Sequence, residues 1–309
     1  DADACLAARG LGACWGVIVE KHRLILFGRY PLDQQWRAAT ACLIVIGALL
    51  YAAKPAHWGR RLPGLWGLAL GVAWVLMAGR VGPWSLQPLG LPPVSSDLWG
   101  GFPLTLMLTS VAITGAFPLA IALALGRTGP WPLIGRLCAS LIEVVRGVPL
   151  VSVLFMASFM LPLLLPAGQS PDVLLRVTAA LTVFLAAYLA EVVRGGLQGV
   201  PAGQVMAGTA LGLGYAGLQR HIVLPQALAH ALPGLVNHFI GIFKDTSLVT
   251  IVSLYELSGA MSLALSGDAD WRPFKVEAYL FIAVIYFVCC FALSRYSLFL
   301  QHRLDARRQ

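Results

Sequence analysis

Lysine is scarce in this sequence, and its scarcity excludes one class of function. The only lysines are at positions 21, 54, 244 and 275, and none of them follows a glycine. A phosphate loop for ATP requires a Gly-Lys-Ser/Thr sequence. We therefore expect neither a nucleotide-binding motif nor ATPase activity in this chain.

Clusters of side chains for metal binding or acid–base catalysis are also missing. The 14 acidic residues are scattered, and the 6 histidines lack ligand-type spacing. His221, His230 and His238 lie near one end of an expected helix, where an interfacial position explains them better than a metal site. Because no stretch is long enough for a soluble enzyme domain, we expect neither an enzyme nor a metal site.

Charge of either sign is low. Only 12% of the residues are charged, 58% are hydrophobic, and the mean hydropathy is +0.78. A soluble domain has roughly 25% charged residues, so this composition indicates an integral membrane protein. Seven runs are apolar enough for helices across about 30 Å of hydrocarbon. They are 37–53, 64–80, 102–125, 137–161, 173–193, 227–260 and 276–300.

The net charge of +8 is spread over loops and helix ends. Such a distribution suits anionic lipid phosphates at a membrane surface better than nucleic acid. We therefore expect membrane lipid, and no nucleic acid, among the partners.

Two cysteines, Cys5 and Cys14, are the only ones outside the apolar runs. They lie in residues 1–37, which contain no span and no signal-peptide core. If this segment is external, an oxidising compartment can join them in a disulfide. The alternative is two unrelated thiols near the membrane surface.

The segment 203–227 differs from the other connections between apolar runs. It is rich in small residues, among them Ala207 and Gly208, and it ends in Ile222-Val223-Leu224-Pro225. Small side chains let a helix approach a partner closely. Proline is well tolerated in the first turn of a following helix. The pattern predicts a docking element and not a plain solvated linker.

This segment resembles the signature loop of ABC importer permeases, E-A-A-x3-G-x9-I-x-L-P. Nine residues separate Gly212 from Ile222, and Leu224 and Pro225 follow, so the spacing matches. Met206 stands where the family has glutamate, which removes any polar contact of that side chain. In the family, this segment forms a short cytoplasmic coupling helix that docks in a groove of the ATPase subunit. The coupling residues that the resemblance implies are Gly203, Met206, Ala207, Gly208, Gly212, Leu213, Ile222 and Pro225.

A short repeat, Glu-Val-Val-Arg-Gly, occurs at 143–147 and 191–195. In each copy the acid and the arginine lie three residues apart on one helix face, so Glu143 can pair with Arg146 and Glu191 with Arg194. Two interpretations remain open. The pairs either anchor helices at the membrane interface, or they line the inward mouth and latch helices that move during transport.

Another polar interruption, Lys244-Asp245-Thr246-Ser247, lies within a long apolar stretch. One interpretation is a turn at the far membrane face, with Asp245 or Thr246 as an N-cap. The interpretation that we favour is one long, broken helix that faces a water-filled cavity, because charges at membrane depth usually mark a pathway. A zwitterion that carries a carboxylate and an ammonium suits this combination of charges.

Four segments together resemble the polar amino-acid branch of ABC permeases. They are EVVRGVPL at 143–150, AEVVRGGLQGVPAGQ at 190–204, IVLPQA at 222–227 and FKDTSLV at 243–249, and the match covers about residues 98–300. The stretches Gly-Ala-Cys-Trp at 12–15 and Gly-Arg-Tyr-Pro at 28–31 look like the general L-amino-acid importer subgroup.

The resemblance implies an all-α integral membrane protein, with a type I importer core of five transmembrane helices and extra N-terminal helices. It also implies an ATPase dimer that carries ATP and Mg²⁺, a second homologous permease that differs from this chain, and a periplasmic amino-acid-binding protein. The location would be a bacterial inner membrane, and a further helix would precede Asp1.

With the coupling loop 195–225 in the cytoplasm, alternation of the spans places the C-terminus there too. Once residues 1–37 are set aside, Lys and Arg are concentrated on that side, as the positive-inside rule expects. The expected organisation is an external or interfacial segment at 1–36, two additional helices in 37–97, the permease core at 98–300 and a cytoplasmic tail at 301–309.

We therefore expect a permease subunit of an ATP-driven amino-acid importer, coupled to a separate ATPase through 203–225. The alternative is an ion-gradient-driven secondary transporter, which also uses broken helices and charges within the membrane. That alternative leaves 203–225 unexplained. A membrane protein without transport activity leaves the polar residues within the spans unexplained.

Overall fold

The structure is a computed structural model, and it describes residues 2–7, 12–59, 61–166 and 168–305. Its helices are α1 (Ala2–Ala7), α2 (Gly16–Phe27), α3 (Gln35–Ala52), α4 (Leu62–Ala78), α5 (Gly101–Thr128), α6 (Pro132–Gly147), α7 (Leu150–Phe155), α8 (Leu161–Leu164), α9 (Val173–Gln198), α10 (Ala202–Ala210), α11 (Tyr215–Leu218), α12 (Leu224–Asp245), α13 (Leu257–Ser266) and α14 (Lys275–Asp305). Strands β1 (Arg80–Val81) and β2 (Trp84–Ser85) pair in an antiparallel hairpin.

Shorter helical turns join or extend these elements. The 3₁₀ turns are Leu32–Gln34, Pro55–His57, Gln87–Leu89, Ser96–Leu98, Thr246–Val252 and Arg272–Phe274, and the π-helical turns are Met156–Met160 and Gln219–Val223. The chain forms two compact units, 1–111 with 154–178 and 243–289, and 112–153 with 179–242 and 290–309. Because the divisions fall within α5, α7, α9, α12 and α14, each of these helices contributes residues to both units.

Five helical segments are long and apolar enough to cross a membrane within the described ranges. They are Leu32–Ala52, Gly101–Thr128, Val173–Gln198, Tyr215–Val252 and Arg272–Arg303. The helix predicted at 64–80 is α4, whose 17 residues are at the short end of the length that a span requires.

The predicted span 137–161 is wrong as one continuous helix. α6 ends at Gly147, and the chain bends before α7 begins at Leu150. Between them Val148 is extended, with φ −107° and ψ 135°. The ring of Pro149 disfavours a helical conformation at the residue before it, and Pro149 has no N–H to donate. The Gly-Val-Pro sequence therefore interrupts the helix.

The predicted span 227–260 ends earlier than expected. After α12, a 3₁₀ helix continues to Val252, and Ser253 then takes a left-handed conformation with φ 65°. Glu256 begins α13 by accepting hydrogen bonds from the amides of Ser258 and Gly259. The turn lies at 253–256 and not at 244–247, so the interpretation of one continuing, altered helix is correct only as far as Val252.

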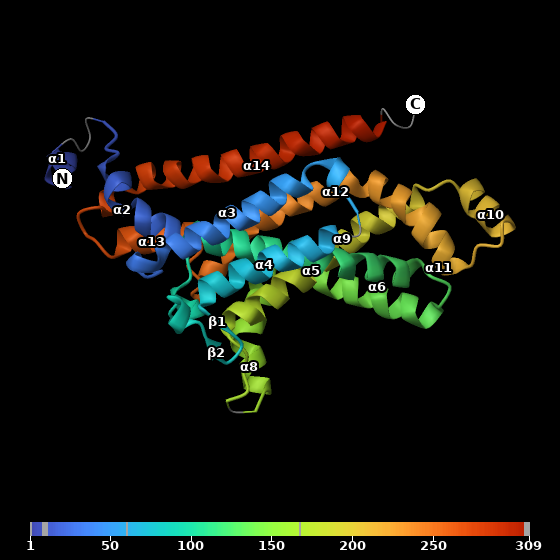
Figure 1. Cartoon of the computed structure of the whole chain (residues 1–309), viewed down its shortest axis with the longest axis horizontal. Coiled ribbons are helices and arrows are strands. Elements are labelled where there is room, and N and C mark those ends of the chain that lie inside the picture. The colour runs from blue at the N-terminus through green and yellow to red at the C-terminus, as the bar shows by residue number, and fades with distance from the viewer. Residues whose placement is uncertain (1, 8–11, 60, 167, 306–309) are drawn as a thin grey trace. The chain divides into compact units, whose positions relative to one another are not determined.

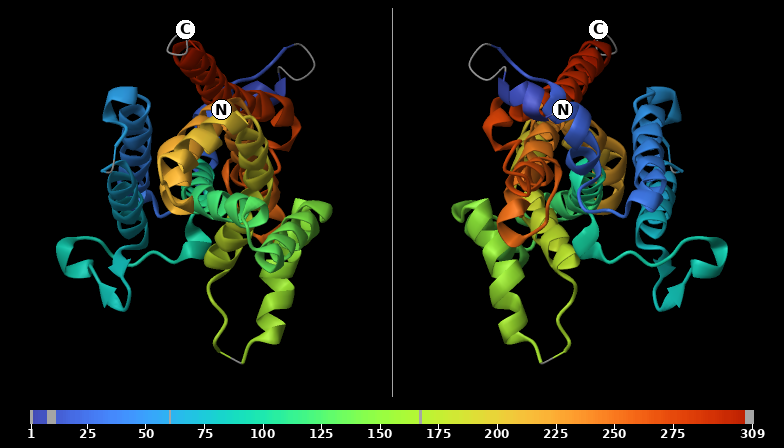
Figure 2. Two further views of the ribbon diagram at one scale, coloured as in Figure 1. Left: turned by 90° about the vertical axis from the view of Figure 1, so that its right-hand side faces the viewer. Right: turned by 90° about the vertical axis from the view of Figure 1, so that its left-hand side faces the viewer.

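In the first unit, α3 and α4 lie side by side (Figures 1 and 2). Arg37 of α3 is fully buried and donates to the carbonyl oxygens of Leu76 and Pro92 at 2.7 and 2.9 Å. A buried charge is stable only when its hydrogen bonds are made, so Arg37 fastens α3 to α4 and to the loop that follows. Nearby, Tyr30 donates to the carbonyl of Met77, and burial raises the pKa of Tyr30 to about 12.

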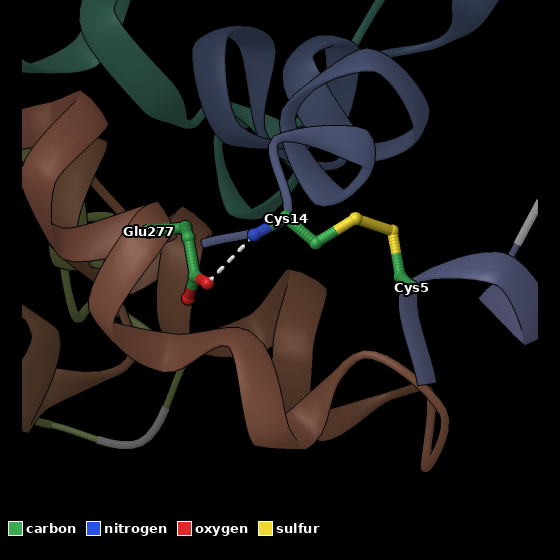
Figure 3. The surroundings of a disulfide bond; sticks show 3 residues. All are labelled: Cys5, Cys14 and Glu277. Carbon is green, nitrogen blue, oxygen red and sulfur yellow. Dashed lines mark hydrogen bonds between the residues drawn. A yellow bond between two sulfur atoms is a disulfide. The ribbon is translucent and has the colours of Figure 1, made fainter. Parts of the chain in front are cut away.

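The N-terminal segment is also anchored within the first unit. A disulfide joins Cys5 to Cys14, and the backbone N–H of Cys14 donates to the buried carboxylate of Glu277 at 3.1 Å (Figure 3). α2 packs against α13. The apolar core around them is built from Val17, Ile25, Leu257, Met261, Ala264, Leu265, Trp271, Phe274, Ala278 and Ile282. The disulfide and this core tie α1, α2 and the start of α14 together.

In the second unit, α9 presents a regular apolar face. Leu181, Leu185, Leu189 and Val193 follow each other at intervals of four residues, and all of them are buried. Residues at this spacing lie on one side of an α-helix. The face fixes the rotation of α9, and therefore the direction in which Glu191 and Arg194 project.

Candidate functional site: the coupling segment and its ion network

The coupling segment, residues 203–225, begins within the short helix α10, whose end is sharply defined. The amide of Gly212 donates to Thr209 O at 2.9 Å, and the amide of Leu213 donates to Gly208 O at 3.1 Å. This pair of bonds is the Schellman arrangement, which needs a left-handed residue at the position of Gly212. Its φ of +79° is such a conformation, and glycine adopts it without steric strain.

The body of the segment folds back on α10. Gly208 is buried, and a Cβ atom there would lie 2.6 Å from Leu218 and 2.8 Å from Ile222. The Gln226 amide donates to Gln204 Oε1 at 2.8 Å. α10 therefore packs directly on α11 and on the π-helical turn 219–223. That turn precedes Pro225, whose ring cannot fit against the carbonyl four residues earlier in a regular helix.

The outer surface of the segment exposes two large apolar residues. The side chains of Met206 and Leu211 are 66% and 82% exposed. Of the other residues implied by the resemblance, Gly203, Ala207, Gly212 and Pro225 are exposed, whereas Gly208 is buried and Leu213 and Ile222 are partly buried. The predicted set thus divides into exposed residues and residues that shape the segment. Leu211 lies outside the signature positions and was missed.

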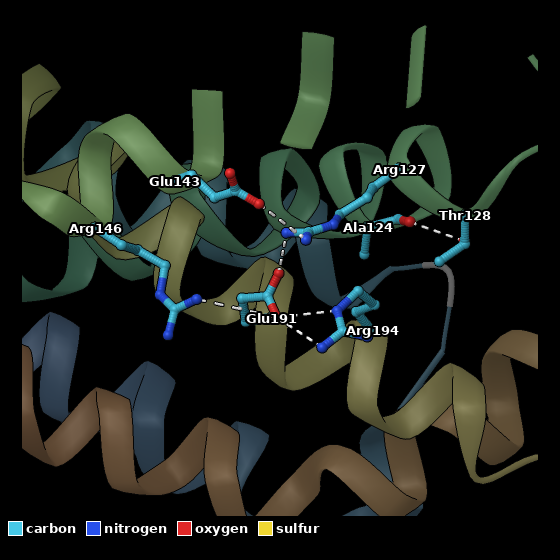
Figure 4. A network of polar contacts seen from close by, with 7 residues as sticks. All are labelled: Ala124, Arg127, Thr128, Glu143, Arg146, Glu191 and Arg194. Atoms are coloured by element: carbon cyan, nitrogen blue, oxygen red, sulfur yellow. Dashed lines mark hydrogen bonds and ion pairs between the residues drawn. The ribbon is translucent and has the colours of Figure 1, made fainter. Parts of the chain in front are cut away.

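An ion network joins α5, α6 and α9 in the second unit (Figure 4). Its centre is Glu191, which accepts hydrogen bonds from Arg127 and Arg194, the latter at 2.9 Å. Arg146 lies 4.0 Å from the same carboxylate. Arg127 also reaches Glu143 at 3.2 Å. Three guanidinium groups therefore share two carboxylates, and Glu191 holds most of the contacts.

The predicted pairing is correct in only one of the two repeats. Glu191 pairs with Arg194 as expected, but among the described residues Glu143 contacts Arg127 and not Arg146. Arg146 instead turns toward Glu191 and lies over the ring of Tyr188, 5.4 Å from its centre. The contacts made from α5 by Arg127 bring charges together that are far apart in the sequence, so the spacing within each repeat could not reveal them.

The polar residues 244–247 differ in exposure. Lys244 is exposed, Asp245 and Ser247 are partly buried, and Thr246 is fully buried. Thr246 donates to the carbonyl of Phe243 at 2.8 Å. Its hydroxyl therefore makes an internal hydrogen bond in this structure.

Sequence reasoning also missed a buried carboxylate, Glu256. Besides capping α13, it accepts from Tyr286 at 2.8 Å and from Thr105 at 3.3 Å. These bonds link α5, α13 and α14 within the first unit. The signal available in the sequence was one acid in an apolar stretch, directly before a Leu-Ser-Gly helix start.

The comparisons with known proteins agree with this geometry. Residues 116–306 match the family described as binding-protein-dependent transport system inner membrane component. The chain belongs to this family. It is 43% identical over 300 residues to the inner membrane amino-acid ABC transporter permease protein YhdY of Escherichia coli, over 96% of this chain and 79% of that protein.

A second relative is the glutamate/glutamine/aspartate/asparagine transport system permease protein BztC of Rhodobacter capsulatus. The two are 38% identical over 343 aligned residues, which cover 95% of this chain and 79% of the relative.

Two solved structures have the same fold. An amino acid ABC transporter crystallised with histidines matches with a TM-score of 0.58 and 31% identity, over 66% of this chain and 92% of its own. The inward-facing MetNI methionine ABC transporter matches with a TM-score of 0.51 and 19% identity, over 64% of this chain and 93% of its own. The predicted all-α, type I ABC importer permease fold is confirmed, and no observation favours an ion-gradient-driven transporter.

Proposed function

We propose that this chain forms part of the path by which an ATP-driven importer carries amino acids across a bacterial inner membrane. The observation that carries the proposal is the coupling segment. It is a short helix with a defined end and an exposed apolar surface, at the position of the family's signature loop. Amino acids are the substrates in the names of both relatives described above.

Docking of an ATPase subunit on the coupling segment would use the exposed Met206 and Leu211. A methionine is flexible and fills irregular apolar gaps, so it can replace the family's glutamate with an apolar contact. The resulting displacement would enter the C-terminal end of α9, which contains Gly195 and Gly196, and reach Glu191, which connects three helices. The ion network would then keep α5, α6 and α9 together as the unit moves.

Lys244, Asp245 and Ser247 are the proposed contacts of the substrate. An ammonium and a carboxylate on neighbouring residues project about 100° apart on a helix, so each is directed to a different partner. A zwitterionic amino acid carries both complementary charges. Thr246 belongs to the packing that supports this segment.

The partners in this proposal are two ATPase subunits that carry ATP and Mg²⁺, a second permease homologous to this chain but different from it, and a periplasmic amino-acid-binding protein. The C-terminus and the coupling segment lie in the cytoplasm. Amino-acid uptake by the reconstituted complex tests the proposal. Uptake should require ATP inside the compartment that bears the ATPases and should persist with an uncoupler, whereas collapse with the uncoupler at full ATP would contradict it.

A further inference from the structure

A solvent-open cavity of about 330 Å³, with exposed polar residues, lies between α13 and the start of α14, within the first unit. Buried Met261 and Leu265 provide its apolar lining. Its polar lining consists of two basic side chains and three hydroxyl groups, from Ser262, Ser266, Arg272, Lys275 and Tyr279. None of the lining residues is acidic, so the cavity has a positive charge that its own walls do not neutralise.

The lining is held in place by local bonds. Arg272 donates through Nη2 to the carbonyl of Ser266 at 2.8 Å, and the Ser266 hydroxyl donates to the carbonyl of Ser262 at 2.7 Å. A guanidinium has five N–H donors, so this bond orients Arg272 and leaves donors for a ligand. Lys275 and Tyr279 are four residues apart, on one side of α14, and Arg272 lies in the 3₁₀ turn directly before them.

Nearby carboxylates are committed to other partners or lie outside the lining. Asp268 binds Lys21 at 2.8 Å, and Glu277 accepts from the amide of Cys14. Asp270 is exposed and does not line the cavity. The cavity therefore fits an anion, and phosphate is the anion that arginine, lysine and hydroxyl groups bind well.

The surface beside the cavity indicates what kind of phosphate compound the cavity binds. Val276, Leu280, Val284 and Phe287 are exposed and share one face of α14, at intervals of four, four and three residues. In the span Arg272–Arg303, only 11% of the most apolar stretch of 18 residues is buried. The cavity lies where this membrane-spanning segment begins, so a group bound there can be continuous with hydrocarbon chains along the helix.

We propose that this cavity binds the phosphate of an anionic phospholipid whose acyl chains lie along the exposed face of α14. The basic and hydroxyl side chains hold the headgroup, and the apolar face provides the contact for the tails. Binding of such a lipid would require neither the transported substrate nor coupling to ATP.

Native mass spectrometry of the purified full chain, with any partners that accompany it, tests this site. Phosphatidylglycerol, phosphatidylcholine or inorganic phosphate is titrated in turn. The variant Arg272→Gln/Lys275→Gln should bind phosphatidylglycerol about 30-fold more weakly, which is the combined effect expected of two basic side chains at an anionic headgroup. Arg23→Gln/Arg80→Gln removes two exposed charges from the same unit outside the cavity, and it should leave the affinity unchanged.

Several outcomes would overturn the proposal. Unchanged binding in the cavity variant, equal affinity for phosphatidylcholine, or full competition by inorganic phosphate would each show that the cavity is not an anionic-lipid site. A photo-crosslinker at Val276 that captures another protein and no lipid would show that a partner covers this face. If the cavity variant does not fold, Ser262→Ala/Tyr279→Phe keeps both charges and should still weaken binding severalfold.

Discussion

Replacement of Glu191 by glutamine is the most informative perturbation of the second unit. Glu191 accepts charge-assisted hydrogen bonds from Arg127 and Arg194, and its side chain is only 16% exposed. A hydrogen bond to a charged group contributes about 1.5–3 kcal/mol. Glutamine keeps the size and one acceptor oxygen but loses the charge, and it leaves three guanidinium groups with one carboxylate. We expect a destabilisation of about 2–3 kcal/mol.

Glu143→Gln is the matched control, because it removes the same charge from the same network. The Glu143 side chain is 65% exposed and makes a single ion pair at 3.2 Å. Exposed pairs contribute about 0–1 kcal/mol, so this change should have little effect.

Thermal unfolding of both variants in the same detergent provides the measurement. For chains somewhat shorter than this one, 1 kcal/mol corresponds to about 2–4 °C. Glu191→Gln should therefore lower Tm by about 4 °C or more, and Glu143→Gln by about 4 °C or less. Glu191→Asp, which keeps the charge, should recover part of the loss. Equal shifts for the two glutamine variants would refute the central position of Glu191.

Three further predictions concern other parts of the chain. Gly212→Asp should abolish retention of the ATPase in pull-downs at normal expression. The control Gly168→Asp changes another glycine with open space around it and a positive φ of +80°, and it should retain the ATPase. Equal retention by the two variants would contradict docking on the coupling segment. A hydrogen bond from its lysine partner holds the pKa of Asp268 below its usual value. Because the folded-state pKa is depressed, ionised Asp268 stabilises the folded protein above the unfolded-state pKa of about 3.9, and this stabilisation is lost as pH falls through the folded-state pKa. Asp268→Asn should therefore make Tm fall less steeply between about pH 5 and 2. An unchanged dependence of Tm on pH would exclude this linkage. Lys244→Met and Asp245→Asn should change KM or the range of amino acids taken up while assembly stays intact; unchanged kinetics for acidic, neutral and basic amino acids would remove both residues from the path.

The fold was largely predictable from the sequence because membrane spans depend on composition and length. The apolar runs at 102–125, 173–193 and 276–300 correspond to α5, α9 and α14. The errors fell where local chemistry interrupts an apolar run. Pro149 interrupts the helix in the predicted span 137–161, and the left-handed Ser253 ends the helix in the predicted span 227–260. A hydropathy profile detects neither of these backbone effects.

The candidate site was predictable where a short motif determines the geometry. The spacing around Gly212 predicted a short helix in this segment, and the left-handed conformation of Gly212 explains why glycine occupies that position. The partners of Glu143 and the bonds of Glu256 depend on contacts between distant segments. Pairing at three residues' separation was a sound expectation for each helix alone, but a nearby arginine on α5 competes for the same carboxylates.

Purification of the tagged chain from its native source in mild detergent, with mass spectrometry of the proteins that accompany it, shows whether the coupling segment holds an ATPase. We expect a P-loop ATPase together with a second, non-identical permease, and loss of the ATPase when Met206 and Leu211 are replaced by acidic residues. A correctly folded chain that purifies with no ATPase would contradict coupling through residues 203–225.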